Sequence, residues 1–453
     1  MKVTFDKTKK HQTFEGFGAS GAWWAQKVGG WTDIDTDGVK TKRDRISQLL
    51  FSKTDGIGLR TYRYNIGGGS AESGKGSYYD DARRAECFGT VGNYDFSRDK
   101  NAVYMLNQAV KDGADEVILF VNSPVESLTQ NGMAQLGKHQ IFRTNLKKKN
   151  YPLFADYCLD VTEHFVKEGV PIKYLSPVNE PLWIWNGGQE GCHYSPWQAG
   201  KVMKCFADKI SERPALREVR LSGVENGDIR WFNKSYTKQM LKYPEVRSLV
   251  DSVDVHSYFT ELPLPSFVNN RAAFLKRFNK WMTRKYPQIP VKMSEWTHME
   301  GGRDSSMNSA LVMAKTICED ITLLNVTSWQ HWLACSPYDY CDGLIYLDLN
   351  SHNYEITKRY YVTGNFSKYI PFGAVRIEAK TDVRDILTVC FEKDNKYTCV
   401  FVNLSDKNES FIAEKDGKTA VTDDSRSLEE SLVSAGDNIS VPRRGVITYQ
   451  FRG

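Results

Sequence analysis

The segment IKYLSPVNEP occupies residues 172–181 of this 453-residue chain. Its first half is an apolar run typical of a buried strand, and it ends in Asn179 and Glu180 with Pro181 directly after. A carboxylate at the end of a buried strand is costly unless a neighbour or a ligand uses it. The segment therefore predicts a buried strand that delivers two polar side chains to a site at its carboxyl end.

Seven further segments have the same strand character and are separated by helical patterns. They are EGFGAS (15–20), GLRTYRYNIG (58–67), EVILFVNSP (116–124), EVRLSGVEN (218–226), SVDVHSYF (252–259), PVKMSEWT (290–297) and NVTSWQHWLA (325–334). The clearest helix covers 151–168, where apolar residues recur on one face from Phe154 to Phe165. Eight strands alternating with helices predict a (β/α)₈ TIM barrel, with a doubly wound sheet as the alternative.

The pattern changes from about residue 371 onward. Short alternating strands with polar turns, such as DILTVCFEK and GVITYQF, predict an antiparallel sandwich. The N-terminal KVTFD also has strand character and is expected to pair with it. We therefore predict a catalytic barrel over residues 15–365 and a discontinuous side β-sandwich formed by residues 1–14 and 366–453.

Composition excludes several classes of protein. The net charge is only +5, with both signs interspersed, so we expect no nucleic-acid partner. No apolar run reaches the length of a membrane span, and MKVTFDKTKK at the N-terminus lacks the apolar core of a signal peptide. The nine cysteines show no metal-ligand spacing and are expected to be reduced. These features favour a cytoplasmic protein without a membrane partner, or a secreted one if a signal was removed, and leave its oligomeric state open.

The active site of a barrel lies at the carboxyl ends of its strands. In this chain those ends carry Arg63, Glu180, His256, Glu295 and several aromatic residues. Two carboxylates without a cofactor or a metal cluster fit glycoside hydrolysis, in which one attacks the anomeric carbon and the other exchanges a proton with the leaving oxygen. A non-catalytic carbohydrate-binding protein is the rival class. GSAESGKG (69–76) has Gly76 where a phosphate-binding loop needs Ser or Thr, so we expect no nucleotide there.

Several motifs in this order resemble glycoside hydrolase family 30, whose members are retaining β-glycosidases. The motifs are GFGAS (16–20), RYNIGGGS (63–70), SPVNEP (176–181), DVHSYF (254–259), KMSEW (292–296), WQHW (329–332) and GNFSKYIPFGAVRI (364–377). The resemblance implies that Glu180 is the acid/base and Glu295 the nucleophile. It also implies roles at the substrate site for Arg63, Asn179, Tyr258 and Trp332. From their positions in the sequence we further expect His256, Trp24, Trp185 and Glu190 to contact the substrate. Asn179 would bind the sugar 2-hydroxyl, Arg63 and Tyr258 would contact the carboxylates, and Trp332 would lie under the sugar. Of the adjacent Trp23 and Trp24, one is expected to line the site and the other to pack.

The substrate expectation depends on fewer residues. AWWA (22–25), RYNIGGGS and QEGCHYSP (189–196) resemble the branch of the family that cleaves β-1,6-linked galactan. Ser70 stands where many members have an Asp that holds the terminal sugar. We therefore expect action on β-1,6-linked galacto-oligosaccharides or galactan as the oligo- or polysaccharide substrate. The alternatives within the family are β-1,6-glucanase, β-xylosidase or xylanase, and β-glucosidase activity.

Overall fold

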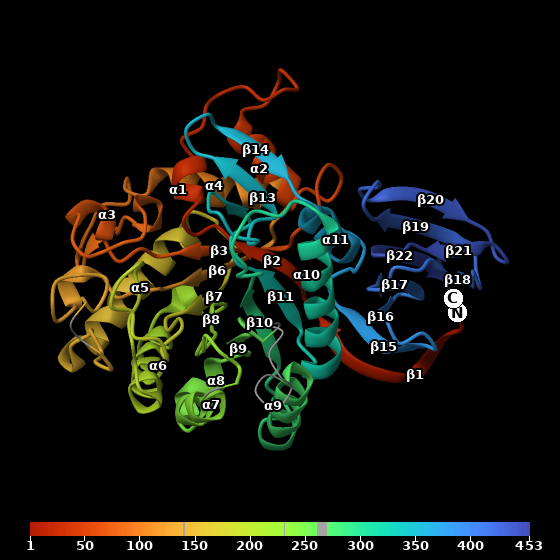
Figure 1. Cartoon of the computed structure of the whole chain (residues 1–453). Helices are drawn as coiled ribbons and strands as arrows, with labels where there is room; N and C mark the ends of the chain where they lie inside the picture. Colours follow the sequence, from red (N-terminus) through yellow and green to blue (C-terminus); the bar gives the residue numbers. More distant parts are fainter. Residues whose placement is uncertain (139–140, 231, 261–269) are drawn as a thin grey trace.

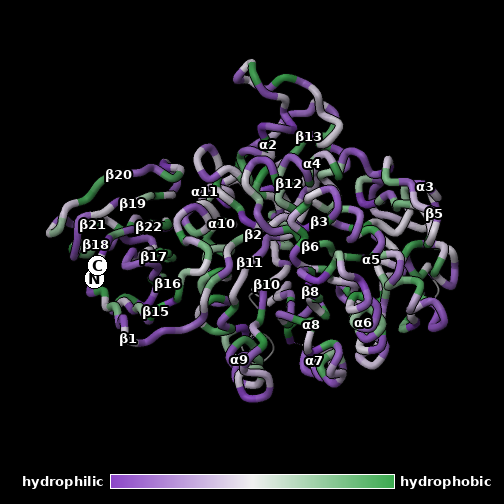
Figure 2. The backbone as a smooth tube through the Cα atoms, turned by 180° about the vertical axis from the view of Figure 1, so that it is seen from behind, coloured by the Kyte–Doolittle hydropathy of each residue, from purple (hydrophilic) through white to green (hydrophobic). Residues whose placement is uncertain are grey.

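The computed structural model describes residues 1–138, 141–230, 232–260 and 270–453. Two groups of strands dominate it (Figure 1): a central parallel sheet surrounded by helices, and an antiparallel sheet at one side. Figure 2 shows the same division from behind, with both chain termini next to each other in the side sheet. Within the described residues, no helix is both long enough and apolar enough to cross a bilayer.

The central sheet has eight parallel strands, and each lies within one of the predicted segments. They are β2 (Gly16–Ser20), β3 (Thr61–Asn65), β6 (Glu116–Phe120), β7 (Ile172–Ser176), β8 (Arg220–Leu221), β9 (Val253–His256), β10 (Val291–Trp296) and β11 (Ser328–His331). Their order is β8-β7-β6-β3-β2-β11-β10-β9. A parallel bridge between Asn226 and Val255 connects the two edges. Because the edge strands β8 and β9 are neighbours, the sheet closes into a barrel, and the predicted fold class is confirmed.

Helices cover the outside of this barrel. The main ones are α2 (Lys42–Phe51), α4 (Lys100–Asp112), α5 (Tyr151–Lys167), α6 (Pro196–Ile210), α7 (Asn233–Leu241), α8 (Pro244–Leu249), α9 (Arg271–Lys285), α10 (Met307–Glu319) and α11 (Lys358–Ser367). The apolar face predicted for α5 is buried. Ser195 and Gln198 form a capping box that starts α6. The chain starts a new helix at Pro244, because a proline cannot donate the backbone hydrogen bond that would continue α7.

Shorter elements lie in the loops between the barrel strands and helices. They are α1 (Ala25–Val28), α3 (Ser70–Ser73), β4 (Gly89–Thr90), β5 (Asn93–Tyr94), β12 (Cys335–Ser336), β13 (Ile345–Asp348) and β14 (Asn353–Ile356). The last three form a small sheet in the long connection between β11 and α11. This connection brings residues far beyond β11 back to the carboxyl ends of the barrel strands.

The side domain contains a seven-stranded antiparallel sheet and a two-stranded one. The large sheet consists of β1 (Val3–Phe14), β15 (Ala374–Thr381), β16 (Ile386–Lys393), β17 (Lys396–Asn403), β22 (Gly445–Arg452), β19 (Gly417–Thr422) and β20 (Glu429–Val433), and the small one of β18 (Glu409–Ile412) and β21 (Asn438–Val441). The N-terminal strand β1 pairs with β15, so the domain is discontinuous as predicted. A second apolar core, including Phe401 and Tyr449, fills it.

One detail of the side domain differs from the sequence analysis. Cys390 and Cys399 lie directly opposite each other in the β16–β17 pair and form a disulfide. The expectation of uniformly reduced cysteines is therefore wrong for this pair. Antiparallel pairing brings two residues nine positions apart into register across a tight hairpin, and the sequence spacing alone did not decide whether they would be bonded.

Candidate active site

A cavity of about 420 Å³ opens at the carboxyl ends of the barrel strands. Six of the predicted site residues line it: Asn179, Glu180, Trp185, Tyr258, Glu295 and Trp332. Arg63 and His256 are completely buried and lie behind the two glutamates. The strand-end rule, together with the family resemblance and the expectation for Trp185, therefore predicted eight side chains that lie in one region, although they come from segments up to 269 residues apart.

Glu295, the predicted nucleophile, is held on both carboxylate oxygens. Arg63 donates from Nη1 to Oε2 at 2.9 Å, and the Tyr258 hydroxyl donates to Oε1 at 2.8 Å. Burial raises the pKa of Glu295, while the cations of His256 and Arg63 oppose that shift. Both donors favour the ionised form and fix its orientation, as an attacking carboxylate requires.

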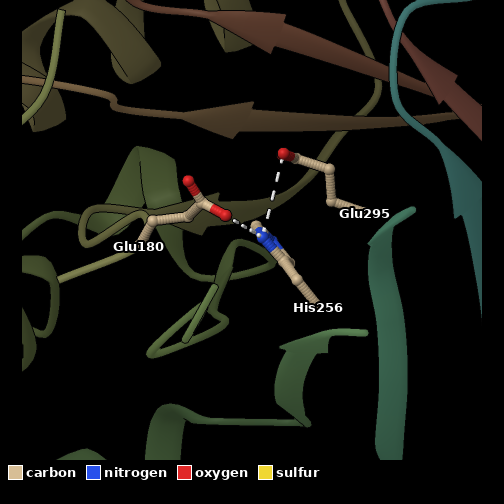
Figure 3. A group of neighbouring side chains, drawn as sticks. All are labelled: Glu180, His256 and Glu295. Carbon is tan, nitrogen blue, oxygen red and sulfur yellow. Dashed lines mark hydrogen bonds and ion pairs between the residues drawn. The ribbon is translucent and has the colours of Figure 1, made fainter. Parts of the chain in front are cut away.

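Glu180, the predicted acid/base, extends into the cavity from the end of β7. Figure 3 shows His256 between Glu180 and Glu295, with Nδ1 3.0 Å from Glu180 Oε1 and 3.8 Å from Glu295 Oε1. The backbone at Glu180 is in the left-handed region, with φ of 42°, a conformation that non-glycine residues rarely adopt outside functional or tightly constrained positions. Its N–H donates to the backbone oxygen of Glu225 at 2.6 Å, which ties the end of β7 to the segment after β8.

A third buried carboxylate, Glu225, completes this group. Arg63 donates from Nη2 to Glu225 Oε2 at 2.8 Å, and His256 Nε2 lies 3.1 Å from the same oxygen. Burial opposes ionisation of Glu225, yet the neighbouring cations, Arg63 first, lower its pKa to about 2. Glu225 is therefore a permanent anion beneath the two glutamates that face the cavity.

The three glutamates determine the charge of His256. Burial alone lowers the pKa of an imidazole, but Glu295, Glu180 and Glu225 together raise that of His256 to about 10. The imidazolium donates from both ring nitrogens. With Arg63 and His256 positive and Glu225 and Glu295 negative, these four charges cancel.

Glu180, His256 and Glu295 are also the group to consider for a metal ion. Each offers one ligand atom, and these atoms lie within 4.8 Å of one another. His256, however, binds carboxylates on both sides with both nitrogens protonated. A metal would have to displace the proton on Nδ1, because only a deprotonated nitrogen can act as a ligand.

The other predicted contacts surround the space between the glutamates. Asn179 donates to Asn122 Oδ1 at 2.9 Å, which orients its amide so that Oδ1 stays free of hydrogen bonds from described residues. The ring of Trp332 borders the cavity and packs edge-on against Trp23 at 5.1 Å. Trp185 donates from its indole nitrogen to the backbone oxygen of Glu180 at 2.9 Å. The rings of Trp332 and Trp185 therefore provide an apolar surface for a sugar near the two carboxylates, and Asn179 Oδ1 provides a hydrogen-bond acceptor.

Two predicted substrate contacts need correction. Trp24 is completely buried and donates to the backbone oxygen of Ser20, whereas Trp23 lines the cavity. Glu190 is also buried; it accepts hydrogen bonds from the backbone N–H groups of Gly68 and Ser70 and from the Ser70 hydroxyl. Glu190 therefore fastens the loop after β3 and does not face the substrate cavity.

Sequence reasoning missed two carboxylates of this region. Glu225 follows the fifth barrel strand, and the rule that identified Glu180 could have found it. Asp342 lines the cavity but lies eleven residues after the end of β11, so no strand-end rule points to it. Arg83, which also lines the cavity, comes from the long loop after β3 and carries no local sequence signal.

Comparison with known proteins adds evidence independent of this geometry. Residues 1–346 match the family model described as O-glycosyl hydrolase family 30. An endo-β-1,6-galactanase from Hypocrea rufa is 24% identical over 405 residues, covering 82% of this chain and 75% of the relative. A glucuronoxylanase from Bacillus subtilis is 23% identical over 348 residues, covering 74% and 71%. The crystal structure of a conserved exported protein from Bacteroides fragilis superposes with a TM-score of 0.87 at 22% identity, covering 99% of this chain and all of the other.

Proposed function

The chain belongs to O-glycosyl hydrolase family 30 and is thus a glycosidase, and we propose that it cleaves β-glycosides with retention of anomeric configuration. The observation that carries this proposal is the spacing of the two glutamates. One carboxylate oxygen of Glu180 lies within 4.8 Å of one of Glu295. Retaining enzymes hold their carboxyl groups about 5–5.5 Å apart, whereas inverting enzymes leave about 6.5–9.5 Å for a water molecule.

The reaction proceeds in two displacements. Glu295 attacks the anomeric carbon while Glu180 transfers its proton to the departing glycosidic oxygen, which gives a glycosyl ester on Glu295. Glu180, now a carboxylate, then takes a proton from water, and this water displaces Glu295 from the same face of the ring that the leaving group vacated. Arg63 and Tyr258 hold Glu295 throughout, and His256 stabilises the negative charge that Glu180 acquires.

For the substrate, we propose β-1,6-linked galacto-oligosaccharides or galactan. Three motifs resemble the galactan-cleaving branch, and a relative covering 82% of the chain is named an endo-β-1,6-galactanase. The cavity supports a sugar ring flanked by aromatic surfaces: Trp183 and Trp185 lie beside Glu180, and Trp23 and Trp332 follow β2 and β11, across the barrel from β7. The glucuronoxylanase relative, at almost the same identity, makes a xylan substrate the main competitor.

The test compares kcat/KM on β-1,6-galactobiose and -triose with gentiobiose and xylobiose. We expect the galacto-oligosaccharides to be cleaved fastest, because a site that hydrogen-bonds the axial 4-hydroxyl of galactose leaves polar groups unpaired when glucose binds. Faster cleavage of gentiobiose or xylobiose would refute the galactan assignment and leave the retaining mechanism intact. Binding of these oligosaccharides without hydrolysis would instead support a carbohydrate-binding protein.

A further inference from the structure

The wall of the cavity formed by the loop after β11 contains polar atoms without partners. Oδ1 of Asp342 and the hydroxyl oxygen of Tyr338 are buried and form no well-aligned hydrogen bond with a described residue, although Ser336 lies near Asp342 and Arg83 lies near Tyr338. Both residues line the cavity, and Asp342 is only 4% exposed. A buried carboxylate oxygen without a donor is costly, so its presence in a binding cavity indicates a ligand hydroxyl that pairs with it.

Asp342 is fixed relative to the reacting groups. Its backbone oxygen accepts a hydrogen bond from the Thr297 hydroxyl at 2.8 Å and lies 2.7 Å from Nε2 of His331. Thr297 follows Glu295 by two residues, and His331 directly precedes Trp332. The distant loop is thereby attached to the ends of β10 and β11, which makes Asp342 a rigid part of the cavity wall.

The surroundings of Asp342 define which end of a sugar it meets. Trp183 and Trp185 lie on the side of Glu180, where the leaving group departs. Trp23 packs against Trp332 at 5.1 Å and Tyr338 at 5.8 Å, and Trp332 follows β11, which lies across the barrel from β7 in the strand order. In a pyranose ring C4 lies opposite C1. A sugar with C1 at Glu295 and its leaving group toward Glu180 therefore directs C4 toward the wall that contains Asp342.

Two other polar side chains, Ser70 and Arg83, cannot take the role of Asp342. Ser70, at the end of β3, donates its hydroxyl to Glu190 at 2.6 Å and is completely buried. Arg83 places its guanidinium over the rings of Trp23 at 4.4 Å and Tyr338 at 4.7 Å, and as a cation it cannot accept a hydroxyl proton. Asp342 is therefore the acidic acceptor at this end of the cavity within the described residues.

We propose that Asp342 determines specificity by accepting a hydrogen bond from the 4-hydroxyl of the galactosyl unit whose C1 reacts with Glu295. This inference rests on the proposed galactosidase function and names the residue that would recognise the sugar. A hydrogen bond from a hydroxyl to a buried carboxylate changes kcat/KM by about 10- to 150-fold. An equatorial 4-hydroxyl points in a different direction, and a 4-deoxy sugar offers no donor at all.

The test measures kcat/KM on the dinitrophenyl β-galactoside, its 4-deoxy analogue and the β-glucoside. Wild-type enzyme is expected to prefer the galactoside to the 4-deoxy analogue by about 10- to 150-fold. Asp342→Ala should lose most of this preference, so that kcat/KM on the galactoside and on the 4-deoxy analogue differ by no more than about threefold. The preference of Asp342→Asn should lie between those of the wild type and Asp342→Ala. The ratio of rates is insensitive to a reduced folded fraction, because misfolding lowers all three rates equally. Asp339→Asn, an exposed residue of the same loop, is the matched control and should keep the wild-type ratio.

The possible failures are distinguishable. A wild-type enzyme that is faster on the glucoside overturns the galactan proposal and this inference with it. A galactose-preferring wild type whose Asp342→Ala variant keeps the full preference over the 4-deoxy analogue overturns this inference alone, and the proposed function stands.

Discussion

Glu225 and His256 face each other where the two edges of the barrel sheet meet, with Oε2 of Glu225 3.1 Å from Nε2 of His256. The same glutamate oxygen accepts from Arg63 at 2.8 Å. One buried anion thus supports both cations that contact the cavity-facing glutamates. Without such partners the buried imidazolium would lose its proton, and the buried guanidinium would be an uncompensated charge.

This relationship predicts the effect of Glu225→Gln. An opposite charge at this distance contributes about 1–3 units to a pKa, so its removal lowers the pKa of His256, and the His256 ring should lose its proton at lower pH than in the wild type. Breaking a buried ion pair also costs about 3–5 kcal/mol of stability. The measurements are an NMR titration of the His256 imidazole and chemical denaturation. The control is Glu218→Gln, because Glu218 is an exposed residue just before β8. A His256 titration curve that is the same in Glu225→Gln as in the wild type would contradict this role of Glu225.

The loss of activity in Glu180→Ala should depend on the leaving group of the substrate. A general acid contributes about 10²–10⁴-fold when the leaving oxygen needs a proton, and far less when it leaves as dinitrophenolate. The variant should therefore be severely impaired on galactobiose and form the glycosyl-enzyme readily from the dinitrophenyl galactoside. The wild-type pH profile should be bell-shaped, and its basic limb should disappear in the variant. Equal losses on the two substrates would argue against Glu180 as the acid.

Chelation should have no effect on activity. In the candidate ligand group of Glu180, His256 and Glu295, the imidazole is protonated and Glu295 is paired with Arg63, and the two-carboxylate mechanism uses no metal. We expect kcat/KM to be unchanged after dialysis against EDTA. Loss of activity that zinc, calcium or manganese restores would show that a metal belongs to the site.

Asp342→Asn should stabilise the protein in a pH-dependent way. Burial raises the pKa of Asp342 from 3.8 to about 6, against the opposing effects of Ser336 and Arg359. Between these values the folded state binds more protons than the unfolded state, so wild-type stability falls as pH rises from about 4 to about 6. The stability of Asp342→Asn does not fall in this way, because asparagine has no carboxyl group to titrate.

The advantage of Asp342→Asn in the free energy of unfolding should therefore grow by about 1–2 kcal/mol between about pH 5 and pH 7.5. Denaturation curves of wild type, Asp342→Asn and the control Asp339→Asn at both pH values measure it. An advantage that is equal at both pH values would mean that Asp342 is not a buried, destabilised carboxylate.

The barrel could be predicted because each strand is a short apolar run at regular spacing, and the residues that follow each run must meet at one end. This reasoning identified Arg63, Glu180, His256 and Glu295 correctly as neighbours. The same logic applied to EVRLSGVEN would have added Glu225, but no proline or aromatic residue follows it to attract attention. Its position shows that charges beneath a site matter as much as those facing it.

Other features depend on how loops fold back, which local patterns do not encode. Trp23 and Trp24 are adjacent and chemically identical, and only the turn at Trp23, with φ of 67°, decides that Trp23 faces the cavity. Glu190 was expected to contact the substrate, but its carboxylate accepts hydrogen bonds from two backbone N–H groups and from the Ser70 hydroxyl. Asp342 reaches the site through hydrogen bonds to Thr297 and His331, which are contacts between distant segments.

The most direct test of the central claim is the anomeric configuration of the product that Glu295→Ala forms with azide. Without its nucleophile the variant should be essentially inactive, and azide should occupy the vacated space, attack C1 of the dinitrophenyl β-galactoside and give α-galactosyl azide, identifiable by its ¹H NMR coupling constant. The β-azide would instead identify Glu295 as the acid/base. An alanine variant that keeps more than about a tenth of wild-type activity without azide would contradict the assignment of Glu295 as the nucleophile of a retaining glycosidase.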